Sequence, residues 1–303
     1  MSLRLEMLQV ARLAPKLLAE STELVERFLR SQQTANGGFR DRMGQGDLYY
    51  TVFGLEGLLA IRTGITIEPM REYLLQFGAG TNLDFVHLCC LARCWAALSN
   101  FDSVALHSLL SKSKTEILQR IELFRSRDGG YHPAPRSEAG TVYGCFLAFG
   151  AYQDFRADCP EPLHLVQCLK LLETSDGAWA NERGMTIGST NATAAAVALL
   201  RQLKMPINSE VGDWLLARAH PQGGFVAAPE APMPDLLSTA TALHALAGLQ
   251  RDFSGVRERC LDFVDSLWTN EGGFHGLWAD EALDCEYTYY GLLALGHLSL
   301  EFN

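Results

Sequence analysis

No stretch of the sequence reaches the roughly 18 consecutive apolar residues that a membrane-spanning helix needs. The beginning of the chain also lacks the apolar core of a secretory signal, because Arg4, Glu6 and Arg12 interrupt its apolar residues. We therefore expect a cytoplasmic protein without a membrane span. The eight cysteines include no Cys-x-x-Cys pair and stand mostly among Leu, Ala and Val, which indicates reduced core residues.

Basic residues are in the minority: 25 Lys and Arg face 35 Asp and Glu, for a net charge of −10. This charge repels phosphate backbones, so no nucleic-acid partner is expected. The sequence contains no strand-like alternation long enough for a sheet and no linker. Because 48% of its residues are hydrophobic, it can form a large core. We expect an all-α protein in which residues 1–303 form a single domain.

Internal repetition is the strongest feature that is present. A glycine-rich turn that ends in an aromatic residue recurs along the chain, and glycine there supplies the backbone freedom to leave a helix. The aromatic side chain can then anchor the turn on the core. The turns are Gly37-Gly38-Phe39, Gly129-Gly130-Tyr131, Gly177-Ala178-Trp179, Gly223-Gly224-Phe225 and Gly272-Gly273-Phe274.

An Asp or Ser opens each of six apolar helical segments, in five cases four residues before a Thr. These residue types cap helix N-termini by accepting a backbone N–H bond, so the pattern predicts six helix starts. Successive starts lie 37 to 53 residues apart, which fits one helical hairpin per repeat. The predicted caps are Asp47, Asp84, Ser137, Ser189, Asp235 and Asp284.

Two kinds of helix alternate in this pattern. The segments after the caps are apolar nearly all round and rich in Ala, Gly and Leu, as expected of inner helices. The segments before the glycine turns are amphipathic: in GVRERCLDFVDSLW, Cys260, Phe263, Val264 and Leu267 form one stripe. We expect these amphipathic segments to be outer helices.

The Gly-Gly-aromatic turns and capped helices resemble the repeats of protein prenyltransferase β subunits and squalene-cyclase-like enzymes. The resemblance covers residues 20–301, and it is sharpest at 136–145 (RSEAGTVYGC) and 284–288 (DCEYT). It implies an (α/α)₆ toroid of about six hairpins, whose inner helices line a funnel that holds an isoprenoid chain.

The zinc site that the resemblance implies is incomplete. Its Asp is present as Asp235, but the position of its Cys holds Leu237 and that of its His holds Tyr287. Since zinc prefers thiolate and imidazole ligands, one Asp does not replace them. We therefore expect no metal and no cofactor, with zinc disfavoured.

The diphosphate site of the family is also altered. Its His falls at Glu138, and its Arg and Lys fall near Ala228 and Ala231, so the contacts become repulsive or are lost. The Asp-x-Asp-Asp and Asp-Asp-x-x-Asp motifs of terpenoid cyclases do not occur either. These departures disfavour ordinary zinc-dependent protein prenylation and leave the choice between transfer and cyclisation open.

Carboxylates and aromatic residues near the helix starts are the candidate site. Paired carboxylates in a dry pocket can retain a proton, and aromatic faces stabilise cations. Capping alone explains most of the acidic residues. His87, Cys90 and Cys94 share a helix face, where a cavity wall is favoured over a metal site. The candidate catalytic residues are Asp284, Glu286, Glu138 and Asp235; the candidate substrate-binding residues are Tyr49, Tyr50, His87, Tyr143, Tyr287 and Tyr290.

Three functions compete. The first is an isoprenoid-binding enzyme with a hydrophobic central cavity that transfers or cyclises prenyl groups without metal. For this enzyme the resemblance also implies a helical partner subunit, with a homodimer as the alternative. A second is a non-catalytic binding or scaffold protein that keeps the toroid. A zinc-dependent prenyltransferase β-like subunit is the third, and a carbohydrate-active barrel working with two carboxylates has little support.

Overall fold

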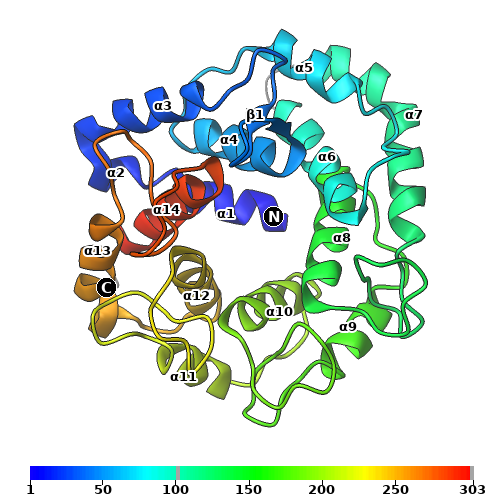
Figure 1. Ribbon diagram of the computed structural model, residues 1–303. Helices are drawn as coiled ribbons and strands as arrows, with labels where there is room; N and C mark the ends of the chain where they lie inside the picture. Colours follow the sequence, from blue (N-terminus) through cyan, green and yellow to red (C-terminus); the bar gives the residue numbers. More distant parts are fainter. Residues whose placement is uncertain (100–102, 301–303) are drawn as a thin grey trace.

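The six apolar segments form an inner ring of helices in this computed structural model, which describes residues 1–99 and 103–300 (Figure 1). These helices are buried on nearly all sides because each packs against two inner neighbours, and most also pack against an outer helix. The ring closes where the last inner helix packs against the first. The inner helices are α4 (Leu48–Ala60), α6 (Phe85–Leu98), α8 (Val142–Asp154), α10 (Thr190–Gln202), α12 (Leu236–Gly248) and α14 (Cys285–Leu298).

An outer ring surrounds these helices and completes the predicted (α/α)₆ toroid (Figure 1). Outer helices bury one stripe each; in the last of them Cys260, Phe263 and Val264 are buried, as the sequence predicts. The outer helices are α3 (Thr22–Ser31), α5 (Ile67–Leu75), α7 (Ser103–Glu122), α9 (Pro162–Lys170), α11 (Glu210–Leu216) and α13 (Ser254–Ser266).

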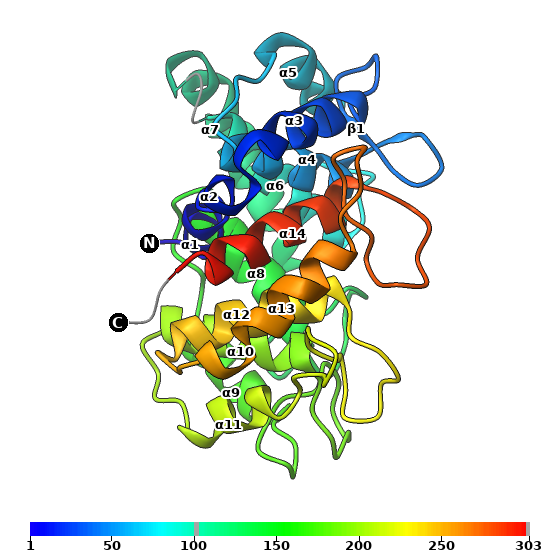
Figure 2. The same cartoon turned by 90° about the vertical axis from the view of Figure 1, so that its left-hand side faces the viewer.

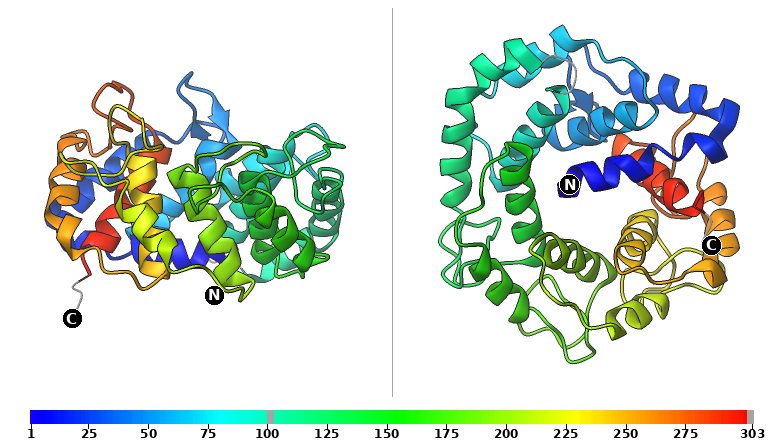
Figure 3. Two further views of the ribbon diagram at one scale, coloured as in Figure 1. Left: turned by 90° about the horizontal axis from the view of Figure 1, so that it is seen from below. Right: turned by 180° about the vertical axis from the view of Figure 1, so that it is seen from behind.

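The N-terminal helix α1 (Leu3–Ala11) lies inside the ring, where it packs against α4, α8, α10 and α14 (Figure 3). The chain then passes through α2 (Pro15–Leu18) and a 3₁₀ turn, η1 (Ala19–Ser21), to reach the outer ring. Both termini lie on one side of the toroid, and the glycine-rich loops protrude on the opposite side (Figure 2). Helix α1 thus covers one end of the ring and leaves the loop side uncovered.

A threonine hydroxyl on the inner helix holds the glycine turn of its own repeat. In the first repeat, Phe39 N–H donates to Thr51 Oγ1 at 2.9 Å, and the short strands β1 (Phe39–Arg40) and β2 (Gly46–Asp47) pair antiparallel, with Phe39 opposite Asp47. The same bond recurs in three other repeats, which explains why a Thr stands four residues after the cap. The equivalent pairs are Trp179–Thr193, Phe225–Thr239 and Phe274–Thr288, at 3.1, 2.9 and 3.4 Å.

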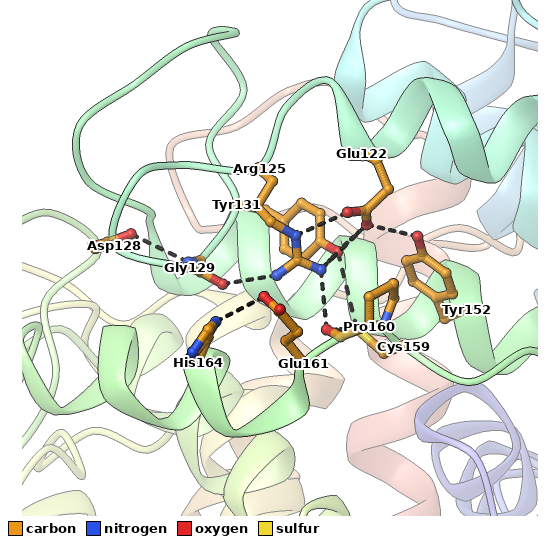
Figure 4. Close-up of polar contacts among 11 residues, drawn as sticks. Glu122, Arg125, Asp128, Gly129, Tyr131, Tyr152, Cys159, Pro160, Glu161 and His164 are labelled. Carbon is orange, nitrogen blue, oxygen red and sulfur yellow. Dashed lines mark hydrogen bonds and ion pairs between the residues drawn. The ribbon is translucent and has the colours of Figure 1, made fainter.

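The third repeat departs from the prediction. Its helix cap is Thr141, whose side chain accepts from Gly144 N–H, and not Ser137 four residues earlier. Cys145 therefore occupies the position of the usual Thr. A polar network replaces the missing bond: Glu122 of α7 accepts from Tyr131 of the turn, from Tyr152 of α8 at 2.6 Å and from Arg125, as Figure 4 shows. The third turn is thus held to both helices by side chains.

Gly223 shows why these turns require glycine. Its φ is +100°, a value that is unfavourable for residues with a side chain. A Cβ added there would lie 1.9 Å from the carbonyl oxygen of Arg259 on α13. The turn can therefore approach the next outer helix only because it has no side chain at this position.

Candidate functional site

The inner ring encloses a cavity of about 300 Å³, closed at one end by α1. Ligand pockets in proteins measure about 300–1,000 Å³, so this cavity is large enough for a small molecule. Its wall is formed by α1 and all six inner helices and is mainly apolar. Apolar lining residues include Val52, Phe53, Leu147, Ala194, Ala198 and Leu237.

A carboxyl–phenol pair lies in the cavity wall where the inner helices begin. Glu286, in the first turn of α14, accepts a hydrogen bond from Tyr49 Oη of α4 at 2.6 Å. Burial raises the pKa of Glu286 to about 7, with a further contribution from Asp284, and Tyr49 and Arg42 oppose the rise only in part. Glu286 therefore populates both its protonated and its ionised form near neutral pH.

Aromatic rings surround this pair. The Phe53 ring lies 5.0 Å from that of Tyr49 and 5.5 Å from that of Tyr290, measured between centroids. Tyr143, from the first turn of α8, lines the same part of the cavity. Burial raises the pKa of Tyr143 and of Tyr290 above the ordinary value, so both hydroxyls stay protonated.

Arg42 neutralises the carboxylates beside this end of the cavity. Its guanidinium donates to Asp284 Oδ2 at 2.9 Å and to Asp280 Oδ2 at 2.8 Å, and it lies 5.5 Å from the centre of the Tyr287 ring. Asp284 also caps α14 by accepting from Tyr287 N–H at 2.9 Å. Burial raises the pKa of Asp284 despite these bonds. Asp284 thus has a structural role as a cap and as an ion-pair partner.

His87 bridges two helix caps on the same side of the ring. Its Nε2 lies 3.0 Å from Asp47 Oδ2, and its Nδ1 lies 2.8 Å from Asp84 Oδ1. The bond to Asp47 is the main cause that raises the pKa of His87 to about 9. His87 is therefore protonated at neutral pH and ties the starts of α4 and α6 together.

Four charged side chains lie at the opposite end of the cavity, next to α1. Arg4 Nη1 donates to Glu56 Oε1 at 3.0 Å, and Arg4 Nε lies 3.2 Å from Asp154 Oδ1. Arg93 Nε donates to Asp154 Oδ2 at 3.3 Å. All four residues line the cavity, and the two carboxylate side chains are only 2% exposed. Burial raises the pKa of Glu56, and Arg4 and Arg93 oppose this rise. With Glu56 ionised, the two positive and two negative charges balance one another in this buried cluster.

Comparison with known proteins places this architecture in a family. A family model, the prenyltransferase alpha-alpha toroid domain, matches residues 5–78 and 192–301. The chain belongs to this toroid family. No curated protein matches its sequence significantly.

Solved structures with the toroid fold differ in what they bind. Candida albicans protein geranylgeranyltransferase-I, complexed with GGPP, shares 16% identity and a TM-score of 0.69, over 91% of this chain and 90% of that one. A variant of the type II terpene cyclase MstE from Scytonema, complexed with its product merosterolic acid A, shares 13% identity and a TM-score of 0.63. That match covers 94% of this chain and 97% of the cyclase chain. A polysaccharide lyase shares 10% identity and a TM-score of 0.60, over 93% of this chain and 97% of the lyase chain. At these identities the likeness shows the fold alone.

The residues at the toroid family's zinc position do not fit zinc. Asp235 caps α12 by accepting from Ser238 N–H at 2.7 Å, Leu237 turns a hydrocarbon side chain to the cavity, and burial raises the pKa of the Tyr287 phenol to about 12. One carboxylate and one neutral phenol are a poor ligand set for zinc. Nowhere in the described residues do three or more His, Cys, Asp or Glu side chains gather closely enough to hold a metal ion.

No described helix is long and apolar enough to span a membrane.

The structure brings together only part of the predicted site. Glu286, Tyr49, Tyr143 and Tyr290 line the cavity at its loop-side end. The other predicted residues on this side do not line the cavity: two cap helices, His87 bridges two caps, and the remaining two are tyrosines whose rings contact Tyr49 or Arg42. These are Asp235, Asp284, Tyr50, His87 and Tyr287.

The predicted site residue Glu138 does not line the cavity. Its side chain is 73% exposed and pairs with Arg127, 2.9 Å away. The physical reason is the cap of α8: because the helix begins after Thr141, Glu138 lies in the preceding loop. A carboxylate so exposed is an ordinary solvated charge.

Sequence reasoning missed the charged cluster at the α1 end. In the sequence, Arg4 is recognisable only as an interruption of an apolar segment, and no motif groups it with Glu56, Arg93 and Asp154. A signal was present, since Glu56 and Arg93 are isolated charges within otherwise apolar inner helices. Such charges are rarely buried unless they are paired, so they predict partners that the sequence alone does not name.

Proposed function

We propose that this toroid protein binds an isoprenoid-type chain in its central cavity and performs acid–base chemistry on it through Glu286, without zinc. The observation that carries the proposal is the apolar cavity that ends at the Glu286–Tyr49 pair. The toroid family includes proteins that act on such chains, and this chain keeps a cavity of ligand size.

The cavity volume sets the size of the ligand. A cavity of about 150 Å³ binds benzene, so about 300 Å³ accommodates roughly a dozen carbon atoms. This corresponds to a chain of two or three isoprene units. A six-unit hydrocarbon such as squalene does not fit unless the ring opens.

The pKa of Glu286 fits proton transfer near neutral pH. A group with a pKa of about 7 can accept a proton in one step and return it in another. It is too weak an acid to protonate an unactivated alkene. It can take a proton from a carbon next to a carbonyl or a cationic centre. The electron pair of the broken C–H bond then forms the new double bond. The Phe53 and Tyr290 rings offer faces that stabilise positive charge during such a step.

The charges on the loop side disfavour a diphosphate substrate. Carboxylates of Asp47, Asp84, Asp284 and Glu286 gather there. The cations among them, Arg42 and His87, are each already engaged by two carboxylates. A diphosphate brought to this rim meets repulsion from these carboxylates, and neither Arg42 nor His87 is free to pair with it, so we favour an uncharged head group such as a hydroxyl or carbonyl.

Binding is tested by calorimetric titration with geraniol and farnesol. Leu237→Trp fills the cavity from its wall and should abolish binding, whereas Leu171→Trp, at an outer site that is 53% exposed, should not change it. If both variants bind like the unmodified protein, the ligand does not occupy the cavity and the proposal is wrong.

Catalysis is tested separately with geranial in deuterium oxide. Incorporation of deuterium next to the conjugated carbonyl system should occur with the unmodified protein and be lost in Glu286→Gln. If geranial binds without any protein-dependent exchange, the protein is a binding protein and the catalytic part of the proposal fails.

A further inference from the structure

The α1 end of the cavity is built for a polar group and not for the end of a hydrocarbon. Arg4, Glu56, Arg93 and Asp154 come from four different helices, α1, α4, α6 and α8, and all line the cavity. An isoprenoid tail placed there would replace the water around these charges without offering any hydrogen bond. Leaving buried polar groups unpaired costs free energy, so a chain that also carries a polar group at this end should bind more tightly than one with a purely apolar tail.

Arg93 and Glu56 have unused hydrogen-bonding capacity that points to such a group. Arg93 has five N–H donors, and its one hydrogen bond to a described residue runs from Nε to Asp154. Its side chain is 17% exposed, in the cavity wall. Glu56 Oε2 is buried and has no hydrogen-bond partner among the described residues. Unused donors therefore face the cavity, and an unpaired acceptor oxygen lies buried in the same charged cluster.

The charge balance selects the kind of group. Two guanidinium and two carboxylate groups already neutralise one another, so a ligand carboxylate or ammonium would add an unpaired buried charge. A hydroxyl is neutral and can accept from an arginine N–H while it donates to a carboxylate. Of the simple end groups, the hydroxyl matches both unused partners.

We propose that the cavity takes a chain with a polar group at each end, whose inner end is a hydroxyl bound by Arg93 and Glu56. This rests on the proposed function, in which the other polar end lies at Glu286 and Tyr49. Tyr49 and Glu56 are seven residues apart on α4, a rise of about 10 Å along the helix. A chain of about ten carbon atoms thus spans the two ends and also suits the volume estimated from benzene binding.

The experiment compares 1-decanol with 1,10-decanediol by calorimetry on the full chain. A second hydroxyl buried against apolar groups weakens binding by about tenfold or more. The proposal predicts that the diol binds at least as tightly as decanol. A diol that binds tenfold more weakly overturns it, whereas a failure of both ligands to bind contradicts the proposed function itself.

Substitutions assign the effect to Arg93. In Arg93→Met the affinity ratio of diol to decanol should fall about tenfold, and Arg127→Met, which removes a 77% exposed arginine, should leave the ratio unchanged. Should Arg93→Met not fold, Arg93→Lys keeps the charge beside Asp154 and loses the planar fork, and it should lower the ratio in the same direction. An unchanged ratio in the folded Arg93 variant overturns the assignment. Tighter binding of 10-hydroxydecanoate than of the diol contradicts the argument from charge balance.

Discussion

Replacing Glu286 by Gln should make the protein more stable at alkaline pH. Raising a carboxyl pKa from 4.5 to about 7 disfavours the ionised group in the folded state by about 3 kcal/mol. Between these values the folded state binds more protons than the unfolded state, so the free energy of unfolding falls as pH rises through this range. Glutamine does not ionise and still offers an oxygen to Tyr49.

Urea denaturation from pH 4.5 to pH 8 measures the effect. The difference in unfolding free energy between Glu286→Gln and the unmodified protein should be below about 1 kcal/mol at pH 4.5 and rise to about 3 kcal/mol at pH 8. Groups common to both proteins, including His87, cancel in this difference. Glu138→Gln is the matched control, because its exposed side chain predicts a difference near zero throughout. A difference that does not change with pH would refute the assigned environment of Glu286.

Three further predictions concern the fold, and thermal and urea denaturation check each of them. Thr51→Val should cost about 1–3 kcal/mol, because it leaves the Phe39 N–H unpaired; no loss of stability contradicts the role of this bond. Gly223→Ala should destabilise more than Gly184→Ala, since only at Gly223 does a backbone oxygen obstruct the new Cβ; equal effects argue against this. Arg4→Met should cost about 3–5 kcal/mol, and adding Glu56→Met should restore part of that loss; an additive further loss rules out the pairing.

The repeat pattern was enough to predict the helical hairpins, and the family resemblance implied that they close into a toroid. Glycine turns, capping residues and helix-period stripes are local signals, and each fixes one element without knowledge of the others. The inner and outer helices and the role of Asp47, Asp84 and Asp284 as caps follow from them, and the structure confirms each. The cap at Ser137 was wrong because Thr141, four residues later, satisfies the same capping chemistry and directly precedes the buried segment.

The candidate site was predictable only at its loop-side end. Glu286 and Tyr49 stand in the first turns of predicted inner helices, so their position toward the cavity follows from the helix starts. The composition of the opposite end depends on the position of helix α1 inside the ring. That position places Arg4 beside Glu56, although the two residues are 52 positions apart in the sequence. Tertiary packing of this kind leaves no periodic signal in the sequence, and so the charged end of the cavity emerged only from the structure.

The most direct test of the account is native mass spectrometry of the purified chain, with zinc quantified, before and after incubation with farnesol and with geranylgeranyl diphosphate. The account predicts one farnesol bound per chain, no stoichiometric zinc and no stable diphosphate complex. Stoichiometric zinc together with bound geranylgeranyl diphosphate would contradict it, because the side chains at Leu237 and Tyr287 would then have to be compatible with a metal-dependent transferase.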